Sequence, residues 1–274
     1  GSAQTISGST TPPFYDLEII NASGVSLLAA SSVSSVFTIT TGYLTATALL
    51  IIGPGASSSA GTNTSHVIGT MRKIGSTPFT FPIGNGVMLT KIGFTLSGAD
   101  ATTQIDAFHS GAPFGDLVNK AASLKKVSQL EYWDLSNSGG TAPTSYGVTL
   151  HWASETGSAT TISGTATSAD LVAAHYTGGA WEDGGQSGYS GGSPGFVSGG
   201  PFTSFSPIAF GSHNDDIPLP VELLYFNASC GAFETVNFSW ETGSEINSSH
   251  FDVLGSKNGF DFDLGFFSGY NNGT

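Results

Sequence analysis

Residues 37–55 read FTITTGYLTATALLIIGPG, and this stretch indicates the fold class. In its first half, Phe37 and Ile39 alternate with threonines, which is the period-two pattern of a strand with one buried face. The apolar run at residues 48–52 has the length of a strand, whereas a membrane-spanning helix needs roughly 18 apolar residues. Gly42 separates the two halves and a Gly-Pro-Gly turn ends the second, so the stretch predicts short strands joined by tight turns.

The same unit of strand, turn and strand recurs through residues 14–75, with glycines at positions 24, 42 and 53. The spacing lies near the low end of the roughly 20–50 residues per repeat that solenoids show. We therefore expect residues 1–75 to form a short β-solenoid-like or strand-rich segment.

From residue 76 the alternation lengthens, as in Val148, Leu150 and Trp152, and predicts a β-sandwich over residues 76–212. Two segments inside it are irregular. Leu117, Leu124 and Val127 are spaced so that residues 115–130 could instead hold a helical turn or two. Residues 178–206 are rich in glycine, serine and phenylalanine and poor in aliphatics, so they predict a long ordered loop.

A proline-rich connector at residues 213–220 precedes a second set of strand patterns in residues 221–274. In the last of these, Phe260, Phe262, Leu264 and Phe266 alternate with aspartates. An immunoglobulin-like sandwich needs about 100 residues, so we expect a partial immunoglobulin/fibronectin-like domain. The predicted fold class is all-β throughout.

The composition restricts the partners of the chain. Seven Lys and Arg against twenty Asp and Glu give a net charge of −13, and only 10% of residues are charged. Nucleic acid and anionic membrane surfaces need clustered cations, and the only basic cluster, at positions 120, 125 and 126, is too small. A lysine-poor, acidic, Ser/Thr-rich surface favours a secreted protein. The single cysteine, Cys230, has no partner for an intrachain disulfide.

Several short motifs occur together in the chain. Near the C-terminus they are Leu219-Pro220-Val221-Glu222-Leu223, Phe238-Ser239-Trp240-Glu241-Thr242 and His250-Phe251-Asp252-Val253, and upstream they are Phe79-Thr80-Phe81-Pro82-Ile83-Gly84 and Glu131-Tyr132-Trp133-Asp134-Leu135. With these motifs the chain resembles large secreted surface proteins of Bacteroidetes-type bacteria that the type IX system exports. The C-terminal block resembles the immunoglobulin- or fibronectin-like module that precedes their sorting domain, although Leu254-Gly255 stands where the family usually has a charged pair. The resemblance implies an outer-surface location and no single activity.

No pattern supports an enzyme. Gly191-Gly192-Ser193-Pro194-Gly195 matches the G-x-S-x-G nucleophile elbow, but the strand, helix and downstream acid and histidine that this motif requires are missing. Glu131 with Asp134, or Glu155, could supply the carboxylate pair of a glycosidase, but solvated surface carboxylates explain them better. We expect no catalytic residue and no cofactor.

Metal binding has little support. The six histidines are scattered, without the spacing of a zinc site. Asp215 and Asp216 are weak candidates for a structural calcium, outside any EF-hand pattern.

Two functional hypotheses remain. The first is a structural subunit of a cell-surface filament or adhesin, because strands in a partial domain leave edges that another copy can cover. Its expected interface residues are Phe14, Tyr15, Leu17, Ile19, Phe260, Phe262, Leu264 and Phe266. The alternative is a monomeric adhesive or carbohydrate-binding module that contacts a surface glycan through Trp181, which lies in a glycine-rich stretch.

Overall fold

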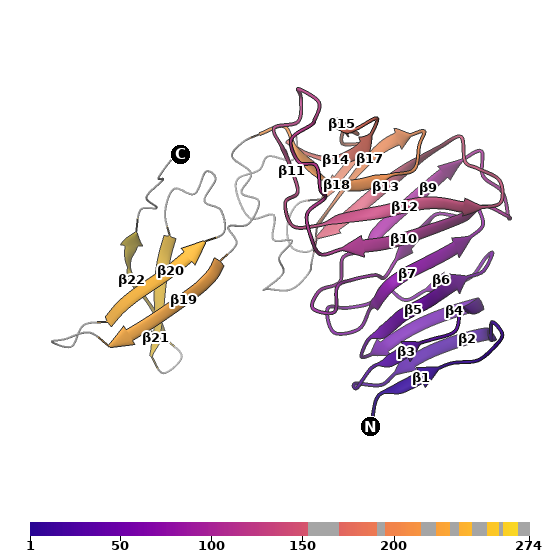
Figure 1. Ribbon diagram of the computed structural model, residues 1–274, viewed down its shortest axis with the longest axis horizontal. Coiled ribbons are helices and arrows are strands. Elements are labelled where there is room, and N and C mark those ends of the chain that lie inside the picture. Colours follow the sequence, from indigo (N-terminus) through magenta and orange to yellow (C-terminus); the bar gives the residue numbers. More distant parts are fainter. Residues whose placement is uncertain are drawn as a thin grey trace. The chain divides into compact units, whose positions relative to one another are not determined.

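The computed structural model describes residues 1–152, 170–190, 195–214, 223–230, 236–242, 251–257 and 260–267. Every regular element within these ranges is a β-strand, so the predicted all-β fold class is confirmed (Figure 1). The chain divides into two compact units, and the division falls between Asn214 and Asp215.

The first unit begins with two stacks of parallel strands. One stack contains β1 (Gln4–Ile6), β3 (Val25–Leu27), β5 (Leu44–Ile52) and β7 (Val67–Ile74). The other contains β2 (Pro13–Ile20), β4 (Ser31–Thr41) and β6 (Ser57–Ser58), and β4 also pairs with β5. Successive coils place residues such as Leu17 and Phe37 side by side. This is the solenoid-like stacking that the glycine spacing predicts.

Apolar side chains fill the space inside the coils. Phe37, Leu27 and Leu44 are fully buried, because alternate residues of each strand point inward. At one corner, Gly42 has a φ of 81°, and a Cβ at this position would collide with the carbonyl oxygen of Asn21 in the preceding coil. The close stacking of the coils at this corner therefore depends on glycine.

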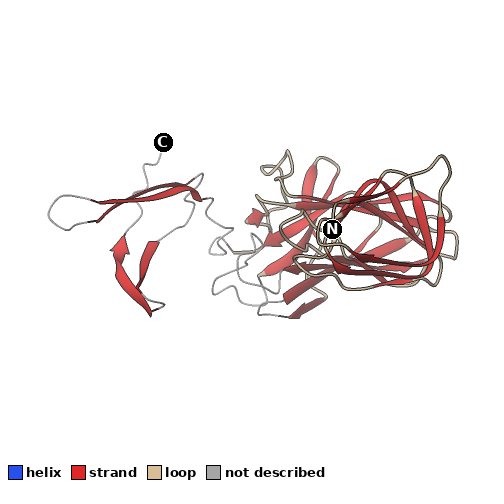
Figure 2. Cartoon of the chain, turned by 90° about the horizontal axis from the view of Figure 1, so that it is seen from below, coloured by secondary structure: helices blue, strands red, loops and turns tan. Residues whose placement is uncertain are grey.

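After β7 the pairing becomes antiparallel, next to the predicted boundary at residues 75 and 76. The first sheet continues in the order β10 (Gln104–Ser110), β12 (Tyr132–Gly139), β18 (Pro207–Ser212), β14 (Leu171–Thr177) and β15 (Ala180–Asp183), with β11 (Lys126–Val127) on β18. A second sheet has the order β16 (Gly188–Ser190), β17 (Gly195–Phe202), β13 (Ser145–Trp152), β9 (Ile92–Ser97) and β8 (Phe79–Phe81). The strands of this unit lie in two layers (Figure 2). Since one sheet runs from β1 to β15, the solenoid and the sandwich form one unit.

Two sequence-based interpretations of irregular segments are wrong. Residues 178–206 contain three strands, β15, β16 and β17, rather than a long loop. Glycine substitutes for the missing aliphatics: a Cβ on Gly195 would collide with Trp152, so the bare backbone of β17 packs directly against the indole. Residues 115–130 form turns and β11, with no helix. Leu124 and Val127 belong to the same core cluster as Trp181 instead, and Leu117 packs against that cluster.

The second unit contains two antiparallel hairpins. They pair β19 (Leu223–Cys230) with β20 (Val236–Thr242), and β21 (Phe251–Lys257) with β22 (Phe260–Phe267). The ring of Phe226 stacks on Phe238 at a centroid distance of 5.9 Å. Strands thus occur where residues 221–274 show alternating patterns, and each described sheet of this unit has two strands.

Candidate functional site

The first coil of the solenoid, which consists of β1 and β2, has two free strand edges in the described part of the chain. In the described part of the chain, β1 pairs only with β3 and β2 pairs only with β4. A hollow of ≈ 420 Å³ lies at this end, and Ile6, Leu17 and Val25 are among the side chains that line it. Free backbone donors and acceptors next to a hollow of mixed polar and apolar lining are the features that an added strand requires.

The predicted N-terminal interface residues lie on β2 in two different environments. Tyr15 is 75% exposed and Phe14 is partly buried, so both are accessible. Leu17 and Ile19 are buried, because they point into the solenoid, and they take part in lining the hollow. The four predicted residues of the C-terminal unit lie on β22.

The direction of the backbone groups at the start of β2 follows from two hydrogen bonds. The amide of Ser32 in β4 donates to the carbonyl oxygen of Pro12 at 3.2 Å. Successive residues of a strand direct their amide and carbonyl groups to opposite sides, so Pro13 presents its groups to the free edge. The register of β2 and β4 shifts between Phe14 and Asp16, but the carbonyl oxygen of Phe14 still faces β4, where it accepts the hydroxyl of Ser34 at 3.2 Å. Because the carbonyl and amide of one planar peptide point in opposite directions, the amide of Tyr15 faces the free edge. Pro13 lacks an amide hydrogen, and proline is tolerated at such an edge.

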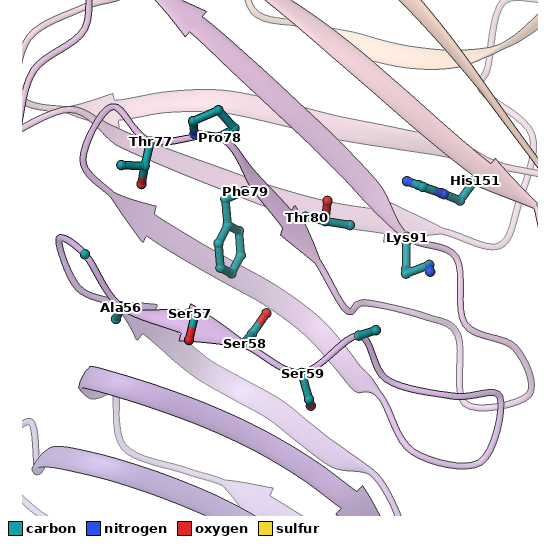
Figure 3. Close-up of a pocket in the computed structure, with 12 residues that line it drawn as sticks. Ala56, Ser57, Ser58, Ser59, Thr77, Pro78, Phe79, Thr80, Lys91 and His151 are labelled. Carbon is teal, nitrogen blue, oxygen red and sulfur yellow. The ribbon is translucent and has the colours of Figure 1, made fainter. Parts of the chain in front are cut away.

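A second feature, the β6–β8 pocket, lies where the two stacks of strands meet the second sheet. We define it by residues 57–59, residues 77–80, Lys91 and His151, and it has a volume of ≈ 500 Å³. Figure 3 shows Phe79 projecting between β8 and the serines of β6, with Lys91 and His151 next to each other at one end. β6 pairs with β4 and β8 pairs with β9, and the two strands β6 and β8 do not pair with each other.

The pocket contains a cation that has no acidic partner among the described residues. The ammonium of Lys91 forms no ion pair or hydrogen bond with a described residue, and burial lowers its pKa. Burial, and then the charge of Lys91, lowers the pKa of His151 to about 4. His151 is therefore neutral at pH 7, and Lys91 supplies the positive charge of the pocket.

A buried lysine holds one wall of the pocket in place. Lys73 is fully buried, and its ammonium donates to the carbonyl oxygen of Ala56 at 2.9 Å, while also bonding to Gly53. The same ammonium lies 5.5 Å from the ring centroid of Phe79. These contacts tie the turn before β6 to the aromatic ring of β8, so the pocket is largely preformed.

The proposed ligand contact at Trp181 is wrong. Trp181 is fully buried, and its indole nitrogen donates to the carbonyl oxygen of Asp116 at 2.6 Å. The ring packs at 5.4 Å from the centroid of Phe114. The loop before β11 therefore covers a tryptophan whose flanking glycines had indicated exposure.

A buried histidine–glutamate pair was not anticipated from the sequence. His109 lies 2.7 Å from the carboxylate of Glu131, and both side chains are buried. Burial raises the pKa of Glu131 although the hydrogen bond to His109 opposes this effect. Glu131 is thus engaged with a histidine inside the sandwich and does not face Asp134 across a cleft; Asp134 is exposed.

The other residues that the sequence suggested for catalysis or metal binding lie outside the described part of the chain. These are Glu155, Ser193, Asp215 and Asp216. Among the described residues, no group of three or more histidine, cysteine or acidic side chains is arranged to hold a metal ion. No described helix is long and apolar enough to cross a membrane.

Comparison of the chain with protein-family models, with curated proteins and with solved structures finds no match. The two sites that could carry a function are the free edges of the first coil and the β6–β8 pocket.

Proposed function

We propose that this chain is a non-catalytic structural subunit that assembles with further copies of itself through strand edges, as in a cell-surface filament or adhesin. The observation that carries the proposal is the end of the solenoid, where β1 and β2 have free edges beside a hollow that Ile6, Leu17 and Val25 help to line. Backbone pairing along an open edge provides affinity, and side chains that enter a hollow provide specificity.

The strand that we propose to occupy this edge is β22 of a second copy. Its sequence alternates Phe260, Phe262 and Leu264 with aspartates, so the pattern gives the strand one apolar face that suits Ile6, Leu17 and Val25 in the hollow. In the described part of the chain, β22 pairs with one strand, β21. Contact between two different surfaces of successive copies is heterologous, and such contacts build fibres when they do not close into a ring.

The composition supports an extracellular location for this assembly. A net charge of −13 with only 10% charged residues suits a secreted surface protein, and the resemblance to exported Bacteroidetes-type proteins agrees with it. Export through the type IX system is part of the same proposal.

The test uses two substitutions of one exposed residue on β2. Tyr15→Pro removes an amide hydrogen that faces the free edge, whereas Tyr15→Thr removes the ring and retains the amide. We expect fibres of the unmodified chain and of Tyr15→Thr in negative-stain electron microscopy. We expect Tyr15→Pro to give mainly single chains by light scattering, because proline blocks edge pairing.

Two outcomes would contradict the proposal. An unmodified chain that remains a monomer of 27.9 kDa would favour a monomeric binding module instead. Fibres of Tyr15→Pro equal to those of Tyr15→Thr would exclude pairing at the β2 edge. Deleting the first coil is a weaker test, because β3 and β4 would then present a similar parallel edge.

A further inference from the structure

The β6–β8 pocket is separate from the edges that we propose for assembly, and it has the properties of a ligand site. Its volume of ≈ 500 Å³ falls within the roughly 300–1,000 Å³ of small-molecule sites. Its lining comes from strands far apart in the sequence, namely β6, β8 and β13, together with the residue before β9. The site therefore exists only in the folded chain.

The charge in the pocket restricts the class of ligand. The Lys91 ammonium is half-buried, and none of the described residues offers it an acidic partner. A partly desolvated cation without a counter-ion is unfavourable, and a carboxylate that enters the pocket removes this cost through a charge-assisted hydrogen bond. The neighbouring His151 is neutral at pH 7, so it offers a hydrogen bond and adds no second charge.

The remaining lining favours a ligand with many hydroxyl groups. Ser57, Ser58, Thr77 and Thr80 line the pocket, and their hydroxyls form no hydrogen bond with a described residue. Ser59 differs, since its hydroxyl accepts the amide of Ile39 at 2.9 Å. Phe79 also lines the pocket, but its ring is only 9% exposed and packs against Phe81, so the polar side chains supply most of the contacts with a ligand.

We propose that the β6–β8 pocket binds an acidic sugar residue, with its carboxylate on Lys91 and its hydroxyls on the serines and threonines of β6 and β8. The sugar can be free or part of a surface polysaccharide, because both present the same carboxylate and hydroxyl groups. This binding is independent of the strand pairing proposed above.

The experiment is saturation-transfer NMR on the full chain, which works for single chains and for fibres. The probes are glucuronate, glucose and acetate at millimolar concentration. We expect glucuronate to bind more tightly than either of the others, since only glucuronate has both the carboxylate and the hydroxyls. Glucuronate attached to a polysaccharide should compete with free glucuronate for the same site.

Two matched variants locate the carboxylate. Lys91→Met retains the aliphatic stem and removes the charge, and we expect it to weaken glucuronate binding about ten- to a hundredfold. Lys125→Met removes a lysine that is exposed on the loop before β11 and should leave binding unchanged. Lys91→Arg should restore part of the affinity, which separates a lost charge from a folding defect.

Four results would overturn the proposal. Equal binding of acetate and glucuronate would show an anion site without recognition of a sugar. Equal binding of glucose and glucuronate would show that Lys91 does not read the carboxylate. Unchanged glucuronate binding by Lys91→Met, or no binding of glucuronate at all, would exclude this pocket as the site.

Discussion

At the scale of single residues, the few cations of this chain have specific structural tasks. Arg72 makes a two-pronged contact with the carboxylate of Asp106, at 2.6 and 2.8 Å, and a third bond to Gln104. Lys73 is buried among backbone carbonyls. Buried charges are stable only when such partners compensate them, so these two positions tolerate substitution poorly.

His151 gives the folded chain a defined dependence on pH. Its pKa falls from 6.5 to about 4 on folding, because burial and the neighbouring Lys91 disfavour the charged ring. The unfolded chain binds the proton more readily, so the contribution to stability is complete above pH 6.5 and is lost as the pH falls toward 4. The upper bound is about 3 kcal/mol, and partial exposure to solvent reduces it.

We expect His151→Gln to flatten this dependence, which thermal melts between pH 4 and pH 7 would measure. Burial also lowers the pKa of His66 and His175, so a slope remains in the variant. The informative quantity is the difference between the two curves. Parallel curves for the two proteins would mean that His151 does not titrate in this way.

The sequence predicted some residue environments and missed others. Alternation placed Phe37 and Ile39 on one buried face of a strand, and both are buried on β4. Trp181 was assigned to the surface because glycines and acids flank it. Its cover comes from Asp116 and Phe114, 65 residues or more away, and no local pattern reports a contact at that separation.

At the scale of elements, the solenoid corner at Gly42 is a sensitive position. Its φ is 81°, and a Cβ would collide with Asn21 of the preceding coil. We expect Gly42→Ala to lower the free energy of unfolding by more than about 1 kcal/mol, because alanine disfavours this conformation and the coil must also shift. Chemical denaturation would measure the loss.

Gly115→Ala is the matched control for this substitution. No atom lies within 4 Å of a Cβ at position 115, and that glycine has no left-handed φ. We expect a change within about 0.5 kcal/mol there. Equal losses at the two positions would argue against close stacking at the corner.

The sequence predicted strands best where aliphatic residues alternate. Glycine spacing also indicated the solenoid, because each coil needs turns at similar places. The prediction failed in residues 178–206, where β17 contains Gly195 and Gly199 in contact with Trp152 and Ala173. A strand that packs through its backbone lacks the aliphatic pattern by which strands are recognised.

At the scale of the whole molecule, the sequence pattern changes near residue 76 from short to longer alternating stretches. This change coincides with a change from parallel to antiparallel strand pairing inside one unit. β7 accepts β5 as a parallel partner on one side and β10 as an antiparallel partner on the other. Sequence patterns describe single strands and do not state their partners, so the continuous sheet from β1 to β15 could not be predicted. The free edges and the β6–β8 pocket depend on these same pairings.

The way in which Arg72 and Lys73 are held has a consequence for proteolysis. The chain offers trypsin only seven Lys and Arg residues, and these two lie within β7, between two partner strands. A protease needs a locally open backbone, which a central strand provides only on extensive unfolding. We expect native digestion to begin at Lys120 or Lys125 in the loop before β11, or at Lys257 at the end of β21. Mass spectrometry of the first fragments would test this expectation, and an early product ending at Arg72 would contradict it. If digestion begins at the sites that we expect, the solenoid strands β1 to β7 remain uncut while the chain after them is cleaved.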